Sequence, residues 1–77
     1  MITQTLETLL ATDAWWRKEL TAREQTFVEN FTMTVDLRDP HWWWKQNLDQ
    51  DLASYRYKNT AKIRRIVRWI MAELGGG

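Results

Sequence analysis

The strongest constraint on the fold is the spacing of apolar residues between positions 61 and 74. The apolar side chains recur three or four positions apart, so at roughly 100° per residue they fall on one arc of a helix. They are Ile63, Ile66, Val67, Ile70, Met71 and Leu74. The opposite arc carries Lys62, Arg64, Arg65 and Arg68. This pattern predicts an amphipathic helix over about 61–74, with Gly75 as its C-terminal cap.

Most of the remaining chain also favours helix. Apolar residues at helical spacing begin near the N-terminus, with Thr3 or Thr5 available as a cap. The tetrapeptide Thr21-Ala-Arg-Glu24 has the form of a capping box and predicts that helix restarts there. Residues 1–30 are therefore expected to form one broken helix or two short ones.

A further helix is predicted after Asp39-Pro40, since an N-cap residue followed by proline is typical of a helix start. The residues that would share one face of this helix are Trp44, Leu48, Leu52 and Tyr55. The segment Tyr57-Lys58-Asn59-Thr60 interrupts the pattern, because Asn59 tolerates a left-handed turn and Thr60 can cap the next helix.

Residues 32–37 depart from the helical period. In Thr32-Met33-Thr34-Val35-Asp36-Leu37, polar and apolar residues alternate and several are β-branched, which predicts a short strand. A single short strand has nothing to pair with inside this chain, so it would need a copy of itself from a second subunit. The alternative is a helix end that runs into a loop.

Size and composition exclude several classes of protein. The chain has 77 residues, no cysteine and one histidine, His41. It is therefore one domain at most, without disulfides or thiolate metal sites, and we expect no metal and no cofactor. So small a core favours oligomerisation as a source of stability. No signal-peptide pattern and no membrane-length apolar run are present, so the cytoplasm is the expected location.

The charge is distributed unevenly although the net charge is only +1. Residues 1–40 carry four basic and seven acidic side chains, and residues 41–77 carry seven basic and three acidic ones. No acidic residue lies between Tyr55 and Trp69, a stretch that contains six arginines and lysines. This asymmetry indicates an anionic partner for the second half of the chain, with a solvated helix face as the alternative.

The predicted order of strand, helix, turn and helix resembles the ribbon-helix-helix family of Arc- and MetJ-type repressors and antitoxins. The resemblance covers about residues 32–74 and rests on Met33-Thr-Val-Asp-Leu-Arg-Asp-Pro40, Leu48-Asp-Gln-Asp-Leu-Ala53 and Asn59-Thr-Ala-Lys-Ile-Arg-Arg-Ile-Val-Arg-Trp-Ile70. It implies an intertwined dimer whose paired strands lie in the DNA major groove. It divides the chain into a helical extension (1–31), a core (32–74) and a flexible tail (75–77).

The same resemblance assigns residues to DNA. Thr34, Asp36 and Arg38 would read base edges, while Met33, Val35 and Leu37 would face the core. The start of the final helix would hold a phosphate with its free backbone amides. The residues assigned to phosphate binding are Lys58, Asn59, Thr60, Lys62 and Arg64.

Six tryptophans are more than a core of this size needs. Trp42, Trp43 and Trp44 are consecutive, and consecutive helical residues point about 100° apart, so all three cannot face one core. Trp69 falls on the polar arc of the last helix. We therefore expect Trp42, Trp43 and Trp69 to lie in an interface, either between two subunits or with a different protein.

Nothing in the sequence suggests catalysis. Ser54, the only serine, has no recognisable pairing with His41, and Asp49 and Asp51 diverge on a helix. We therefore expect a binding protein rather than an enzyme, with no small-molecule substrate.

Two functions follow from these patterns. The first is a DNA-binding transcriptional regulator or antitoxin-like homodimer, mainly α-helical with one short strand. The alternative is an all-α helical bundle that acts as a protein-interaction module or inhibitor of phage or plasmid type and docks through exposed tryptophans.

Overall fold

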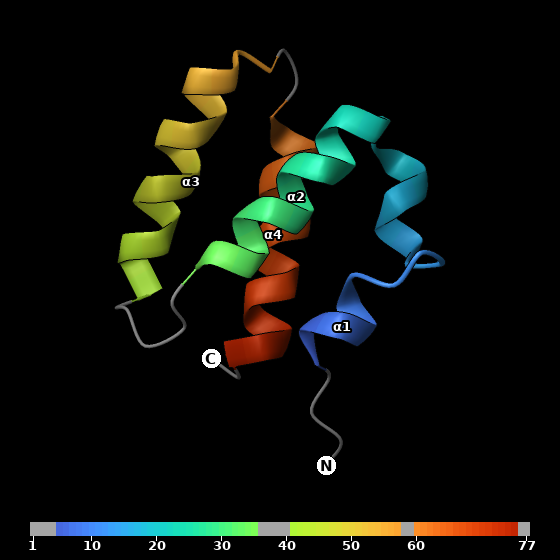
Figure 1. The fold of residues 1–77 in the computed structure, drawn as a ribbon. Coiled ribbons are helices and arrows are strands. Elements are labelled where there is room, and N and C mark those ends of the chain that lie inside the picture. Colours follow the sequence, from blue (N-terminus) through green and yellow to red (C-terminus); the bar gives the residue numbers. More distant parts are fainter. Residues whose placement is uncertain (1–4, 36–40, 58–59, 76–77) are drawn as a thin grey trace.

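Five helical elements make up the part of the chain that the computed structural model describes, namely residues 5–35, 41–57 and 60–75, with backbone only at 41, 42 and 75. They are α1 (Leu6–Leu9), the 3₁₀-helix η1 (Trp15–Glu19), α2 (Ala22–Thr34), α3 (His41–Tyr55) and α4 (Ala61–Gly75). α2 and α4 cross in the middle of the molecule, with α3 on one side and α1 and η1 on the other (Figure 1).

The C-terminal helix forms as its apolar period predicts. In α4, Ile63, Ile66, Val67 and Ile70 are completely buried and Met71 is nearly so. The basic side chains lie outside this arc, on the exposed or half-buried part of the helix. The prediction of an amphipathic helix over 61–74 is confirmed, and its apolar arc supplies the centre of the core.

The start of α2 follows from the predicted capping box. The Thr21 hydroxyl accepts a hydrogen bond from the Glu24 amide at 3.2 Å, and the Glu24 carboxylate accepts one from the Thr21 amide at 2.9 Å. Two amides at the helix start, those of Thr21 and Glu24, are thereby satisfied. Upstream, α1 is capped by the Thr5 hydroxyl and stops after one turn. The region expected as one broken helix or two short ones therefore holds α1, η1 and the first part of α2.

The predicted strand at 32–37 is wrong over its described part. Residues 32–34 continue α2, and Val35 is its extended C-cap. The β-branched threonines are accommodated because their hydroxyls donate back to helix carbonyls, Thr32 to Val28 at 2.7 Å and Thr34 to Phe31 at 3.0 Å. Positions 36 and 37 lie outside the described residues.

Burial explains why this segment is helical although its alternating pattern predicted a strand. Phe27, Val28, Phe31 and Thr32 are buried, and their three- and four-residue spacing needs a helical backbone. Met33, which a strand would have turned inward, is 64% exposed. Tertiary packing of the aromatic face thus overrides the local β preference.

α3 packs on α2 and α4 through a narrow apolar row. Trp44, Leu48 and Leu52 are buried, whereas Tyr55, predicted on the same face, is 53% exposed at the end of the helix. Trp43 is 44% exposed beside the buried Trp44. This difference is expected for adjacent residues of a helix, which point in different directions.

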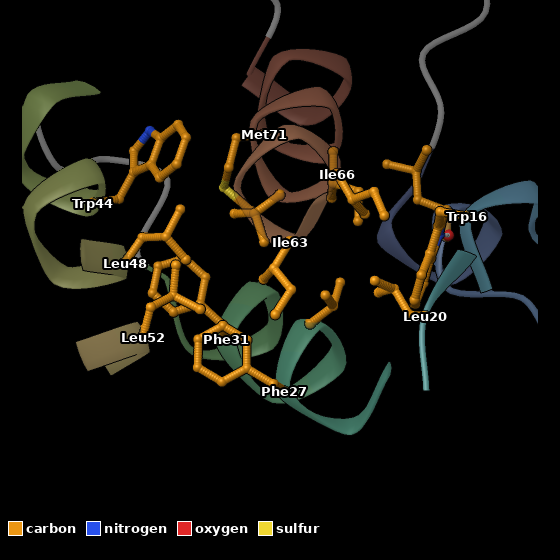
Figure 2. Packing of buried hydrophobic residues seen from close by; sticks show 14 residues of the cluster. Trp16, Leu20, Phe27, Phe31, Trp44, Leu48, Leu52, Ile63, Ile66 and Met71 are labelled. Atoms are coloured by element: carbon orange, nitrogen blue, oxygen red, sulfur yellow. Dashed lines mark hydrogen bonds between the residues drawn. The ribbon is translucent and has the colours of Figure 1, made fainter. Parts of the chain in front are cut away.

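One apolar cluster joins all the helices (Figure 2). Leu9, Trp16 and Leu20 contribute from the N-terminal side and pack in the same cluster as the buried residues of α2, α3 and α4. The predicted boundary between a helical extension (1–31) and a core (32–74) falls inside α2. Residues on both sides of it therefore share one core.

The described residues contain no strand, so the predicted ribbon-helix-helix fold is wrong and the all-α bundle, held as the alternative, fits. A ribbon requires extended backbone where α2 is helical. Among the described helices, none combines the length and the apolar content needed to cross a bilayer.

Candidate interaction surface

The two adjacent tryptophans of η1 have opposite environments. Trp16 is completely buried, and its indole nitrogen donates to the Leu9 carbonyl at 2.8 Å. Trp15 is 47% exposed. In a helix with three residues per turn, consecutive side chains diverge by about 120°. Because Trp16 anchors η1 in the core, Trp15 is directed to the surface.

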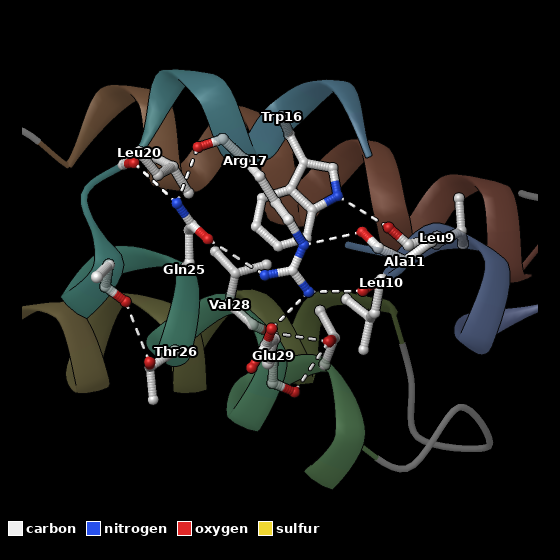
Figure 3. Close-up of polar contacts among 12 residues, drawn as sticks. Leu9, Leu10, Ala11, Trp16, Arg17, Leu20, Gln25, Thr26, Val28 and Glu29 are labelled. Atoms are coloured by element: carbon white, nitrogen blue, oxygen red, sulfur yellow. Dashed lines mark hydrogen bonds and ion pairs between the residues drawn. The ribbon is translucent and has the colours of Figure 1, made fainter. Parts of the chain in front are cut away.

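Arg17 fixes the backbone around η1 (Figure 3). Its Nε donates to the Ala11 carbonyl at 2.8 Å, and its Nη2 donates to the Leu10 carbonyl and the Glu29 carboxylate. Its Nη1 donates to Gln25 Oε1 at 3.2 Å. The Arg17 side chain is only 15% exposed. A guanidinium with several donors in a fixed plane can satisfy these acceptors together, which a lysine cannot.

Two further contacts complete this polar network. Gln25 of α2 donates from Nε2 to the carbonyls of Arg17 and Leu20, at 2.9 and 3.1 Å. The Arg17 guanidinium also lies 4.7 Å from the centre of the Trp16 ring. Within the described residues no buried side-chain polar atom lacks a hydrogen-bond partner. The conformation of η1 is therefore set by hydrogen bonds as well as by apolar packing.

The exposed Trp15 packs edge-to-face on Trp69 of α4, with ring centres 5.2 Å apart and planes at 77°. Beside them, Arg65 of α4 forms an ion pair with Glu19 of η1 at 3.0 Å. These two contacts bring η1 and α4 together at the surface. Edge-to-face packing is a favoured geometry for aromatic pairs.

Two exposed lysines lie on the same helix faces as this pair. Lys18 is one 3₁₀ turn after Trp15, so both point in nearly the same direction. Lys62 precedes Trp69 by seven residues, about 20° short of two full turns of α4. Both lysines are exposed, and neither has an ion-pair partner among the described residues. We call the surface formed by Trp15, Lys18, Lys62, Arg65 and Trp69 the tryptophan face.

The basic arc of α4 is partly neutralised by other elements. Arg64 forms an ion pair with Asp49 of α3, and Arg65 does so with Glu19 of η1. The absence of acids between Tyr55 and Trp69 in the sequence therefore does not mean an unpaired basic surface. The acids come from segments that are distant in sequence and adjacent in space.

Of the residues predicted to read bases, only Thr34 lies among the described residues. Thr34 is in the last turn of α2, and its hydroxyl is bonded to the Phe31 carbonyl. Asp36 and Arg38 lie outside the described residues. The structure therefore tests only Thr34 of these three residues, and Thr34 lies on a helix and not on a strand.

Of the residues predicted to bind phosphate, Thr60 and Arg64 contact each other at the start of α4. The Thr60 hydroxyl accepts a hydrogen bond from Arg64 Nε at 3.2 Å, while Arg64 also pairs with Asp49. Lys62 is exposed on α4. Lys58 and Asn59 lie outside the described residues.

The residues predicted to form an interface are divided between two parts of the molecule. Trp43 is exposed on α3, and Trp69 is half-buried against Trp15 on the opposite side. The side chain of Trp42 lies outside the described set.

Sequence reasoning missed Trp15 and Arg17. The argument that adjacent helical residues diverge applies to Trp15 and Trp16 as well as to residues 42–44, and it would have placed one of the pair at the surface. For Arg17 no local pattern exists, because its acceptors are two loop carbonyls and two side chains of α2.

Comparison with protein-family models gives no match, and neither a curated protein nor a solved structure matches this chain. Among the described residues, no group of three or more histidine or carboxylate side chains is placed to hold a metal ion. The case for a function therefore depends on the surface itself.

Proposed function

We propose that this chain is an all-helical protein-interaction module that docks on an acidic partner protein through the tryptophan face. The observation that carries the proposal is Trp15, which is half-exposed and packs on Trp69. Its neighbours Trp16 and Arg17 fix η1 through hydrogen bonds to the Leu9 and Ala11 carbonyls, so the position of Trp15 is fixed as well. Tryptophan is enriched among the residues that dominate binding energy at protein interfaces. A side chain already ordered in the free protein loses little entropy on binding.

The charges around the tryptophans define the chemistry of the partner. Lys18 and Lys62 are exposed cations on the same face as the two rings, and they complement acidic residues placed around an apolar or aromatic contact. A second copy of this chain fits less well. In a two-fold interface the same patch meets itself, so two surfaces with the same excess of positive charge would be brought together.

DNA binding by this protein remains a prediction, and the ion pairs of α4 weigh against it. Arg64 and Arg65 are engaged with carboxylates, and the net charge of the chain is only +1. DNA affinity depends mainly on the number of phosphates that free cations neutralise. Pairing with Asp49 and Glu19 reduces the number of such cations.

Two of the sequence arguments for a homodimer, the excess of tryptophans and the single unpaired strand, carry less weight. The chain buries Trp16 and Trp44 by itself, and its described residues include no strand that needs a partner strand. The homodimer stays a prediction, without these two supports. A cytoplasmic location and the absence of enzyme activity remain part of the proposal.

Trp15→Ala is the variant that tests the docking proposal. Wild type, Trp15→Ala and a Met33→Ala control would be immobilised and used to retain proteins from nuclease-treated extract of the source cells, and each retained protein would then be purified. Met33 is a large exposed apolar residue on α2, so it controls for loss of surface area elsewhere. We expect the purified partner to bind wild type and Met33→Ala equally. Trp15→Ala should weaken binding about thirtyfold, as expected for a residue worth about 2 kcal/mol.

Two results would contradict the docking proposal. One is a partner whose affinity is the same for wild type and Trp15→Ala. The other is retention that disappears with nuclease, together with duplex-DNA affinity that falls on a log–log salt plot with a slope of about −0.9 per phosphate contacted. The second result would favour the DNA-binding regulator.

A further inference from the structure

A groove lies between α2 and the C-terminal end of α3, away from the tryptophan face. It has a volume of about 430 Å³, within the usual range of small-molecule pockets. Four aromatic rings line it: Phe27 and Phe31 from α2, Tyr55 from α3 and Tyr57 just after α3. Threonine and asparagine side chains of α2 complete its polar edge.

The rings form one connected wall. Phe27 stacks on Phe31 with ring centres 5.9 Å apart, and it meets the Tyr55 and Tyr57 rings edge-to-face at 5.5 Å each. Phe27 and Phe31 are buried and so form the floor, whereas Tyr55 is 53% exposed and forms the rim. The groove therefore offers aromatic surface to a ligand.

One end of the groove already holds a cation. The Arg23 guanidinium lies 4.6 Å from the centre of the Tyr57 ring and donates to the Tyr55 carbonyl at 3.0 Å. The Tyr57 hydroxyl in turn donates to the Arg23 carbonyl at 3.4 Å. These contacts keep Arg23 in position at the Tyr57 end. Its positive charge disfavours a second cation there.

The other end carries the opposite charge. Asp51 lines the groove one helical turn before Tyr55, about 6 Å along α3. α2 and α3 run in opposite directions (Figure 1), and Arg23 near the start of α2 contacts Tyr55 at the end of α3. Asp51 is therefore displaced from Tyr55 in the direction away from Arg23. Among the described residues Asp51 has no ion-pair partner.

We propose that this groove binds a small aromatic amine, with its ring against the Phe27–Tyr55 wall and its ammonium group beside Asp51. The aromatic wall accepts the ring by stacking and attracts the cation through the ring faces. Asp51 attracts the ammonium group and Arg23 repels it, so the charges of the groove orient the ligand. The site is separate from the tryptophan face, and either proposal can fail without the other.

Three probes of similar size separate charge from shape. 2-Phenylethylammonium, 2-phenylethanol and 3-phenylpropionate share a phenyl ring and carry a positive, a neutral and a negative head. Each would be titrated into ¹⁵N-labelled protein, with amide shifts followed by NMR. We expect the amine to bind most tightly and the carboxylate most weakly, with the largest shifts at residues that line the groove.

Two variants test the residues that carry the proposal, and Asp13→Asn is the matched control. Asp51→Asn should weaken amine binding about two- to fivefold, the contribution of a solvent-exposed ion pair, and leave the alcohol unchanged. Asp13→Asn removes the same charge from an exposed loop position and should change neither. Tyr55→Leu keeps apolar bulk but removes the ring, and it should weaken the amine more than the alcohol.

The proposal is overturned if none of the probes binds, if the carboxylate binds as tightly as the amine, or if the shifts map outside the groove. Equal amine affinity in wild type and Asp51→Asn would also overturn it. The amide spectrum of each variant shows directly whether its fold is retained. Both substituted side chains are exposed, so the core is left intact.

Discussion

The two flanks of the α2–α4 pair are held in different ways. On one side, the segment from α1 to η1 is fixed by a network in which Arg17 and Gln25 bind backbone carbonyls and Trp16 donates to Leu9. On the other side, α3 buries Trp44, Leu48 and Leu52, and its polar contacts are exposed, an ion pair at Asp49 and a hydrogen bond from Arg23 to the Tyr55 carbonyl. The first flank presents Trp15 packed on Trp69, whereas the second presents Trp43 and leaves an open groove.

This difference shows how a chain of 77 residues stabilises an irregular segment. The loop from residue 10 to residue 14 and the short η1 bury few side chains of their own, so their carbonyls need donors from elsewhere. Arg17 supplies several donors at once. α3 satisfies most of its backbone groups internally, so apolar contacts along one face are sufficient.

The largest expected effect is in α4, which supports both flanks. Ile66 and Ile70 are completely buried, so replacing either by alanine should lower the free energy of unfolding by about 2–5 kcal/mol. Chemical denaturation measures this change. A loss below about 0.5 kcal/mol, typical of a surface substitution, would mean that α4 is not central to the core.

Replacing either of two arginines, one beside each flank, should lower the free energy of unfolding by a smaller amount, and the two losses should differ. Arg17→Met should destabilise the protein by about 2–4 kcal/mol, because it leaves loop carbonyls and the partly buried Glu29 without their donor. Arg23→Met removes one exposed hydrogen bond and one ring contact, and should cost less than about 1 kcal/mol. Equal losses in the same denaturation assay would remove the distinction between the flanks.

The smallest expected effect is at Met33. Because its side chain is 64% exposed on α2, Met33→Ala should change the free energy of unfolding by no more than about 0.5 kcal/mol. A paired strand would have placed this side chain in a core. A loss of several kcal/mol on thermal or chemical unfolding would therefore favour the strand over the helix.

The sequence was informative where one local pattern determined the structure. The apolar arc of α4 and the Thr21–Glu24 capping box both formed as predicted, because each depends on residues within a few positions of one another. The strand prediction failed because it weighed the alternation in 32–37 without the aromatic spacing that begins at Phe27. Burial of Phe27 and Phe31 extends the helix through Thr34.

The candidate surfaces could be predicted only in part. An interface was predicted at Trp42, Trp43 and Trp69. Trp43 is exposed and Trp69 packs on Trp15, but Trp15 itself was not predicted, and the Trp42 side chain lies outside the described residues. The basic stretch was visible, whereas its neutralisation by Asp49 and Glu19 was not, since these ion pairs join residues 15 and 46 positions apart. The groove required knowledge of how α2 and α3 pack, which no pattern within either helix contains.

The most direct test of the central claim is the solvent exposure of Trp15, measured by ¹⁹F NMR on protein labelled with 5-fluorotryptophan. The Trp15 resonance would be assigned with a Trp15→Phe variant, and its H₂O–D₂O isotope shift compared with that of Trp16. We predict a large shift for Trp15 at every protein concentration, and its loss when the purified partner is added, with Trp16 unchanged. Protection of Trp15 in the isolated protein, or protection that grows with protein concentration, would contradict the account and indicate self-association through this face.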